Sequence, residues 1–371
     1  MKTILVLGNG FDLNCNLKSR FSDFFETRME ETVVSGSKGI VLKEQFKNNI
    51  WYIIFFFAFY GNRIPEPLFD SESLFPLIST DSPLWMDVES YIKRIMTSKD
   101  SRIRKYISAV GEKTYIDVFE LACSGKADYS NYLYRRTQFR ELKSHFSRND
   151  SIRRNKTMAE YLFYELQLFE NDFKAYLLKE TKEKESEYKT QSQALLKKLK
   201  ERNSENLYIL SFNYTKPNTS QYDIMNHVHG DLRNRVIIGY DSSEINSADN
   251  PYLMLTKGWQ KLFDGTKDNS LPDKDSINCI KVYGHSLGEQ DYSYFHALFD
   301  YYDVYSRDIS LVFYYTEYED TPEKNEKIRA NYISKVYTLL DKYVLESEKE
   351  NKRRTFVSRL QLENRLKIKK I

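Results

Sequence analysis

The sequence predicts an α/β fold with a doubly wound, mostly parallel, Rossmann-like sheet and a large helical insertion. The first observation is the apolar run KTILVL at residues 2–7, followed at once by Gly8-Asn9-Gly10. Such a run before a glycine turn is typical of a buried parallel strand. The second is a group of similar runs that begins only at residue 207, and the third is the helical patterning between them. Together they indicate a first strand separated from the others by an insertion.

The later strands are expected where short apolar runs are bounded by turn residues. These runs are LYILSF at 207–212, VIIGY at 236–240, INCIKVY at 277–283 and ISLVFYY at 309–315. Several of the intervals between them are long enough for a crossover helix, which favours parallel pairing.

Helices are expected between and after these strands. In residues 159–178 apolar side chains recur every three or four positions and form one stripe, made of Leu162, Leu166, Phe169, Phe173 and Leu177. Glu170 and Asp172 are expected on the solvated face of this helix. Residues 179–200, rich in Lys and Glu, predict a solvated continuation, and residues 323–345 predict a final helix.

The order of these elements predicts a divided chain. We expect residues 1–31 and 201–371 to form a split nucleotide-binding core and residues 32–200 to form a mostly helical insertion domain. A length of 371 residues suits such a division. The most apolar run, residues 51–60, is about half the length that spans a bilayer and predicts a buried helix in the insertion.

Composition and charge narrow the classes of function. The formal net charge of +3 argues against a dedicated nucleic-acid-binding protein, although residues 351–371 are locally basic. The three cysteines lie far apart and form no CxxC pair, so neither a zinc site nor a disulfide framework is indicated. This cysteine usage and the lack of a signal-peptide layout predict a cytoplasmic protein without membrane association.

The turn Gly8-Asn9-Gly10 and the following Asp12 form the first candidate ligand site. Glycines let a backbone approach a phosphate closely, and the helix N-terminus that follows offers N–H groups. In an open α/β sheet such a turn lies at the carboxyl edge, where ligands bind. The full GxGxxG fingerprint is absent, because position 13 is Leu13. The alternative is a tight turn without a ligand, in which Asp12 caps the helix.

Polar residues follow the second expected strand. Asn213, within SFNYT, can orient a ribose hydroxyl or a water, or can serve a turn. His229, within HVHGD, can act as a general base, or can be a structural histidine. His227 and His229 have the i, i+2 spacing of metal ligands, but no further His or Cys lies nearby with ligand spacing, so no metal is expected.

The segment GHSLG at 284–288 follows another expected strand and matches the nucleophile elbow GxSxG of serine hydrolases. Those enzymes need an acid and then a His after the Ser, whereas the one His after Ser286 is His296, which precedes the next strand. The favoured interpretation is a second glycine turn that faces a ligand. The residues assigned to the ligand there are Gly284, His285, Ser286 and Asp291.

A weaker candidate is WMDVE at 85–89, within the expected insertion. Trp85 would pack the insertion onto the core and leave Glu89 near the ligand. The alternative is the start of an ordinary amphipathic helix.

Four segments, in this order and spacing, resemble one family. They are ILVLGNGFDLNCNL at the start, WMDVE, SFNYT with HVHGD, and YGHSLGEQDYSYF. Together they are similar to the AbiH family of bacterial anti-phage abortive-infection proteins. One departure is Cys15-Asn16, where the family usually has Gly after the GNGFDL segment.

AbiH proteins are in turn distantly similar to Sir2-like NAD-binding proteins. This resemblance implies NAD as the ligand, with Asn213 and His229 at the positions of the Asn and His that drive cleavage of the nicotinamide–ribose bond. It also implies a Sir2-like sheet, the Gly8 turn against the pyrophosphate and Ser286 on the adenosine side. Thr215 stands where the Sir2-like pattern usually has Asp. The four-cysteine zinc module of the deacylases is missing, so a deacylase is not expected.

The resulting expectation is an anti-phage abortive-infection protein that acts as an NAD glycohydrolase and depletes NAD on infection. One alternative is a non-catalytic sensor of NAD or ADP-ribose. Another is a nucleic-acid-targeting toxin, suggested by the basic residues 351–371, although apolar residues among them are equally typical of a packed helix or strand. The expected partners are a small-molecule nucleotide, a phage-derived trigger and a second copy of the chain, rather than nucleic acid or a membrane.

Overall fold

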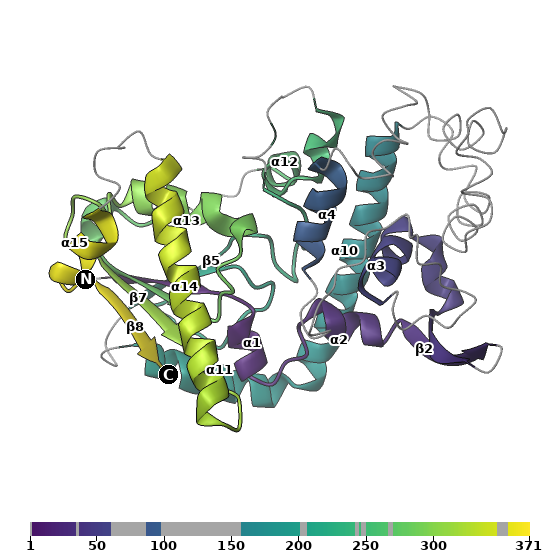
Figure 1. The fold of residues 1–371 in the computed structure, drawn as a ribbon, viewed down its shortest axis with the longest axis horizontal. Coiled ribbons are helices and arrows are strands. Elements are labelled where there is room, and N and C mark those ends of the chain that lie inside the picture. The colour runs from purple at the N-terminus through teal and green to yellow at the C-terminus, as the bar shows by residue number, and fades with distance from the viewer. Residues whose placement is uncertain are drawn as a thin grey trace. The chain divides into compact units, whose positions relative to one another are not determined.

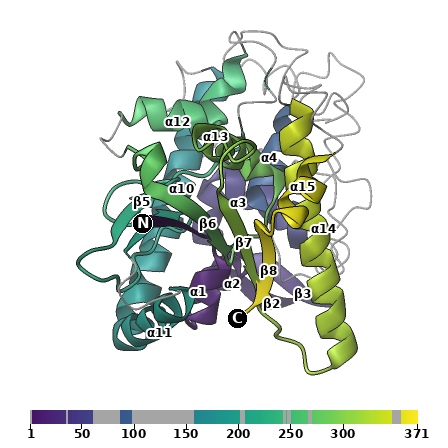
Figure 2. The same ribbon diagram turned by 90° about the vertical axis from the view of Figure 1, so that its left-hand side faces the viewer.

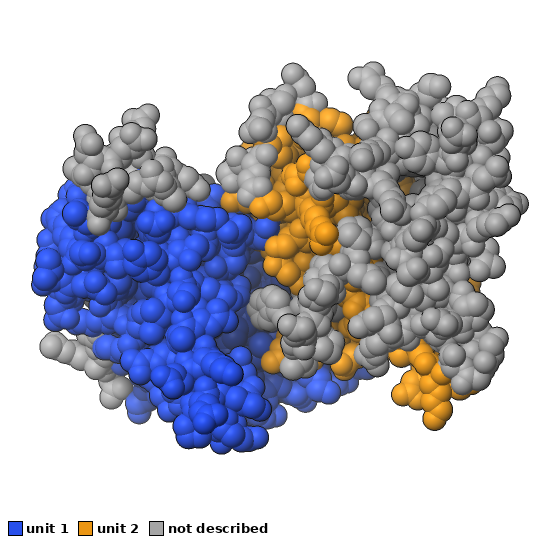
Figure 3. All heavy atoms as spheres, viewed as in Figure 1, with its two compact units in different colours: residues 1–19, 177–236, 266–371 blue, residues 20–176, 237–265 orange. Residues whose placement is uncertain are grey.

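The computed structural model describes residues 2–34, 37–60, 87–97, 157–200, 206–241, 245, 250–265, 270–346 and 355–371. The chain divides into two compact units, coloured separately in Figure 3. Unit 1 comprises residues 1–19, 177–236 and 266–371, and unit 2 comprises residues 20–176 and 237–265. The expected division into a core of 1–31 plus 201–371 and an insertion domain of 32–200 stays a prediction.

Unit 1 contains a six-stranded sheet in which all neighbouring strands are parallel (Figure 2). Its strands are β1 (Lys2–Leu7), β4 (Leu207–Ser211), β5 (Ile224–His227), β6 (Ile277–Tyr283), β7 (Ser310–Tyr315) and β8 (Leu366–Lys370). They lie in the order β5-β4-β1-β6-β7-β8. Counted along the chain within this sheet, the order is 3-2-1-4-5-6, that of the Rossmann fold. It reverses between β1 and β6, so ligands are expected at the carboxyl ends of these two strands.

Helices cover both faces of this sheet. Successive residues of a strand point to opposite faces, so each inner strand contributes side chains to two cores. Ile4 and Val6 of β1 join a core with α13 (Tyr292–Tyr301), α14 (Pro322–Glu346) and α15 (Phe356–Leu362). Leu5 and Leu7 join a second core with α1 (Gly10–Asn14) and α11 (Glu185–Leu199). Two short 3-10 helices, η5 (Lys274–Ser276) and η6 (Glu289–Asp291), flank β6. The doubly wound α/β fold is therefore confirmed.

The described residues of unit 2 are mostly helical and pack around an aromatic core. Its helices in the described residues are α2 (Phe21–Glu26), α3 (Ile50–Tyr60), α4 (Val88–Thr97), α12 (Lys257–Phe263), η1 (Glu44–Asn48), η4 (Pro251–Leu255) and the part of α10 (Met158–Glu183) up to Tyr176. Figure 1 also shows the antiparallel hairpin of β2 (Met29–Val34) and β3 (Ser37–Leu42). Phe24 and Phe25 of α2 pack against Tyr52 of α3 and Phe169 of α10.

Most expected elements of regular structure are confirmed. The strands at 2–7 and 277–283 have the expected bounds, and those at 207–212 and 309–315 differ by one residue. The stripe from Leu162 to Leu177 on α10 is buried, and the run 51–60 is the buried helix α3. The helices expected at 179–200 and 323–345 are the end of α10 with α11, and α14.

The prediction of a strand at 236–240 is wrong. Val236 and Tyr240 each form one isolated bridge, with Gly230 and Thr256. Side chains of unit 2 satisfy the backbone between them, because Glu170 Oε1 accepts from Ile238 N–H at 2.8 Å and Gln260 donates to Ile238 O at 2.9 Å. Glu170 is thus 1 % exposed, which corrects its expected place on a solvated face.

Two strand regions, β5 and the hairpin of β2 and β3, were not expected from the sequence, and β8 was considered only as one alternative for the basic C-terminal residues. β5 and β8 are the two edges of the sheet, and their residues IMNH and LKIKK have few apolar side chains to signal burial. The hairpin of β2 and β3 lies in a stretch expected to be helical. The packed helix or strand considered for the basic C-terminal residues is present as α15 and β8.

Candidate functional site

The two glycine turns of unit 1 are in direct backbone contact. Gly8 N–H donates to Tyr283 O at 3.0 Å, and Gly10 N–H donates to Gly284 O at 2.7 Å. A Cβ atom on Gly8 would lie 2.4 Å from His285 Cα, and Gly284 has a φ of +71°. The glycines are therefore required by the packing of the β1 turn against the β6 turn. The two turns lie at the point where the strand order reverses.

Asn9, at the tip of the first turn, is held by Ser19. Ser19 Oγ donates to Asn9 Oδ1 at 2.5 Å, and Asn9 Nδ2 donates to Ser19 O at 3.4 Å. These contacts fix the Asn9 side chain against the segment that follows α1.

Asp12 lies in a buried cluster of polar side chains and does not cap α1. Its two oxygens accept from Tyr188 at 2.7 Å and from Thr215 at 2.6 Å. Burial raises the pKa of Asp12 to about 6, against hydrogen bonds from Thr215, Tyr188 and Asn213 that lower it. In place of the capping considered as the alternative, Asp12 links α1, α11 and the turn after β4.

Asn213 follows β4 and is 6 % exposed. Its Nδ2 donates to Gly8 O at 3.0 Å, and its own backbone carbonyl is 2.8 Å from His227 Nδ1. Because a carbonyl can only accept, this contact puts the proton of neutral His227 on Nδ1 and its lone pair on Nε2. Asn213 therefore joins the turns after β1 and β4 and orients a histidine at the end of β5.

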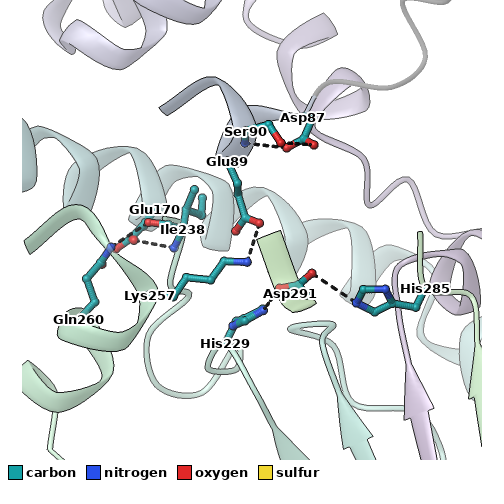
Figure 4. A network of polar contacts seen from close by, with 10 residues as sticks. All are labelled: Asp87, Glu89, Ser90, Glu170, His229, Ile238, Lys257, Gln260, His285 and Asp291. Carbon is teal, nitrogen blue, oxygen red and sulfur yellow. Dashed lines mark hydrogen bonds and ion pairs between the residues drawn. The ribbon is translucent and has the colours of Figure 1, made fainter. Parts of the chain in front are cut away.

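Asp291 bridges the two histidines of the HVHGD and GHSLG segments (Figure 4). Its Oδ1 is 2.9 Å from His229 Nε2, and its Oδ2 is 3.3 Å from His285 Nε2. Both histidines are buried, with side-chain exposures of 5 % and 4 %. This carboxylate lies between β6 and α13 and links loops that follow β5 and β6.

Aromatic rings enclose both imidazoles. The Phe212 ring meets His229 edge-on at 5.2 Å between centroids and His285 edge-on at 4.6 Å. Tyr294 packs edge-on against His229 at 5.2 Å, and Phe295 packs edge-on against His285 at 5.0 Å. These contacts restrict the rotation of both histidine side chains.

Unit 2 has a separate set of buried charges. Lys257 Nζ lies 2.7 Å from Glu89 Oε2, and the lysine side chain is 1 % exposed. Asp87 caps α4 by accepting from the backbone and hydroxyl of Ser90. The expected helix start in WMDVE is therefore present, with Glu89 in a buried ion pair, and Trp85 lies outside the described residues.

The structure brings most of the predicted site residues together at the carboxyl edge of one sheet. Gly8, Asn9, Gly10 and Asp12 follow β1, and Asn213 and His229 follow β4 and β5. The remaining residues follow β6 and are Gly284, His285, Ser286 and Asp291. Ser286 is half-buried.

Several residues of the site were not singled out as site residues in the sequence. Tyr188 comes from α11, whose Lys- and Glu-rich sequence indicates only solvation. Phe212 and Thr215 lie close to Asn213 in the sequence, and their place in SFNYT was the sequence feature that could have identified them as site residues. Lys257 belongs to the separate ion pair of unit 2 and has no distinguishing sequence context.

Within the described residues, no group of three or more His, Cys, Asp or Glu is arranged to hold a metal ion. Among the helices described, none has the length and apolar character needed to cross a bilayer.

Comparison with known proteins identifies the family. The family model for bacteriophage abortive infection AbiH matches residues 4–315. The chain belongs to the AbiH family. The match covers β1 to β7 and includes both glycine turns, Asn213, His229 and Asp291. No curated protein and no solved structure matches the chain. The family places this AbiH protein in bacteriophage abortive infection.

Proposed function

We propose that this AbiH protein acts in abortive infection by hydrolysing the nicotinamide–ribose bond of NAD. The observation that carries the proposal is a His–carboxylate pair, His229 with Asp291, at the carboxyl edge of a sheet with the Rossmann strand order. This edge is where dinucleotides bind in such sheets. The resemblance of Asn213 and His229 to the catalytic residues of Sir2-like proteins supports the same reaction.

The proposed chemistry is a displacement at C1′ of the nicotinamide ribose. As the C1′–N bond breaks, its electron pair goes to the ring nitrogen of nicotinamide, and positive charge develops on the ribose. Water then forms the new C1′–O bond, and His229 accepts the proton that water loses. The products are nicotinamide and ADP-ribose, and the proton passes to solvent. Asn213 is proposed to position the water or a ribose hydroxyl.

The fit of a dinucleotide to the glycine turn differs from the expectation. The amides of Gly8 and Gly10 donate to Tyr283 O and Gly284 O, so a pyrophosphate at this turn needs other donors. The nucleotide contacts of Asn9, Ser286 and the other residues assigned to NAD stay predictions. Residues around the edge, not the two glycine amides, are proposed to supply the polar contacts.

The test is release of nicotinamide from NAD by the full-length protein. Wild type is expected to release nicotinamide, and His229→Ala to lose at least about 100-fold in rate, the usual contribution of a general base. Asn213→Ala is expected to lose activity as well. Asp300→Asn, which alters a carboxylate bonded to Tyr343 on the far end of α13, serves as the matched control and should retain full activity. Release that persists in His229→Ala would contradict the assignment.

A second candidate is a sensor that binds NAD or ADP-ribose without cleaving it. The burial of Asn213 and His229, at 6 % and 4 % exposure, favours it because both side chains already bond to protein groups. A rise in melting temperature with NAD, in the absence of nicotinamide release, would support the sensor over the hydrolase.

A further inference from the structure

We propose that Asp291 is a positioning residue that holds the proton of His229 on Nε2, and that His285 anchors Asp291 for this task. The inference rests on the proposed function only in what it assigns His229 to do, that is, to accept a proton. The arrangement of protons itself follows from contacts in unit 1. It gives Asp291 and His285 a role other than the nucleotide contact expected from the sequence.

A backbone amide fixes the position of the proton on His285. Leu287 N–H donates to His285 Nδ1 at 3.0 Å. A ring nitrogen that accepts a hydrogen bond carries no proton, so the proton of His285 is on Nε2 and the ring is neutral. His285 Nε2 therefore donates to Asp291 Oδ2, 3.3 Å away.

The turn that makes this contact has an uncommon backbone. Leu287 has a φ of +54°, in the left-handed region that apolar L-residues rarely adopt, and it is 2 % exposed. Gly284, one residue before His285, has a φ of +71°. Glycine adopts such a φ without strain, whereas the left-handed conformation of a residue such as Leu287 persists only where the surrounding structure enforces it, and such residues cluster at functional sites. The strained turn thus holds the Leu287 amide on His285 Nδ1.

His285 leaves one carboxylate oxygen of Asp291 for His229. That oxygen, Oδ1, accepts from His229 Nε2 at 2.9 Å. Neutral His229 then has its proton on Nε2 and its basic lone pair on Nδ1. Phe212, which packs edge-on against both imidazoles, keeps the two rings in the orientation that this pattern requires.

Asp291→Asn tests the pattern because it replaces one acceptor oxygen with a donor. His285 Nε2 still carries a proton, so it must face the Asn oxygen. The new NH₂ group must then face His229 Nε2, which has to accept. The variant is therefore expected to move the proton of neutral His229 from Nε2 to Nδ1, while the tautomer of His285 stays unchanged.

The experiment is long-range ¹H–¹⁵N NMR of the full-length protein labelled in its histidine rings. The chain has five histidines, so single His→Gln variants assign the signals. At a pH where His229 is neutral, wild type is expected to show a protonated Nε2 and an unprotonated Nδ1 at both His229 and His285. Asp291→Asn is expected to reverse the pattern at His229 alone. Asp300→Asn, an Asp on α13 that accepts from Tyr343, is the matched control and should change neither ring.

Two results would overturn the inference. One is a wild-type His229 with its proton on Nδ1, which decides the matter even if Asp291→Asn fails to fold. The other is a folded Asp291→Asn variant whose His229 keeps its proton on Nε2. Nicotinamide release is not part of this readout. If the expected tautomers are found but NAD is not cleaved, the proposed function is wrong and the positioning role of Asp291 stands. If NAD is cleaved but the tautomers differ from those expected, the positioning role is wrong and the proposed function stands.

Discussion

At the scale of single residues, the site has two features. Two turns approach each other so closely that only glycine fits between them, and several buried polar side chains need hydrogen-bond partners. Gly8 and Gly10 stand where the β1 and β6 turns meet, and Asp12 and Asp291 each bridge side chains from separate segments. The sequence predicted which residues follow the strands, because glycines and polar residues after apolar runs are a local pattern. It did not predict their partners, because Tyr188 reaches Asp12 from a helix 176 residues further along the chain.

Gly8→Ala is expected to destabilise the protein by about 1–3 kcal/mol, the usual cost of forcing atoms into a packed site. The added Cβ would lie 2.4 Å from His285 Cα and 2.7 Å from Gly284 O. Gly288→Ala is the matched control, since its nearest neighbour is Ser286 Oγ at 3.6 Å and its φ of −73° suits alanine. Urea unfolding measures both, and equal midpoints for the two variants would contradict the close contact of the turns.

Asp12→Asn is expected to change how stability depends on pH. The pKa of Asp12 is raised from 3.8 to about 6 in the folded protein, so the folded state holds this proton more tightly than the unfolded state. Its contribution to stability is fully present below pH 4 and is lost as pH rises through about 6. A shift of this size corresponds to roughly 3 kcal/mol.

Asparagine cannot titrate, so the free energy of unfolding of Asp12→Asn minus that of wild type should increase between pH 4 and 7. Urea unfolding at several pH values measures this difference, in which the other titrating groups cancel. A difference that does not vary with pH would show that Asp12 has an ordinary pKa.

At the scale of elements, burial decided what the sequence could predict. The inner strands β1, β4, β6 and β7 are mostly apolar and were all expected within one residue. The edge strand β5 was missed, and β8 was considered only as one alternative, because half-exposed strands need few apolar residues. VIIGY at 236–240 has the composition of a buried strand, but the side chains of Glu170 and Gln260 take the place of a neighbouring strand. That substitution depends on segments distant in sequence.

Arg365 illustrates how an edge strand is attached without a large apolar face. Arg365 directly precedes β8, and its buried guanidinium donates to the carbonyls of Val304 at 2.8 Å and Arg307 at 2.7 Å. Arg365→Met leaves these acceptors without their donor and is expected to cost about 2–4 kcal/mol.

Hydrogen exchange of the β8 amides should also become faster in Arg365→Met. Lys367→Met, on the half-exposed face of β8, is the control and should leave both stability and exchange near wild type. Unchanged exchange in Arg365→Met would mean that pairing with β7 alone holds β8.

At the scale of the whole molecule, the family match gives a role in bacteriophage abortive infection, and the sheet gives a Rossmann-type strand order. The family was predictable because its motifs are contiguous segments at the ends of strands. The two compact units are interleaved along the chain, since unit 2 combines residues 20–176 with residues 237–265, which lie between two segments of unit 1. A segment that joins another unit in this way is not marked by any change of composition in the sequence.

The most direct test of the account is hydrolysis of NAD in ¹⁸O-labelled water by the full-length protein, followed by mass spectrometry of the products. We predict that wild type releases nicotinamide and ADP-ribose that carries one ¹⁸O atom, and that both products are lost in His229→Ala. Intact NAD, or the same labelled product from His229→Ala, would contradict the claim that His229 and Asp291 form a hydrolytic site.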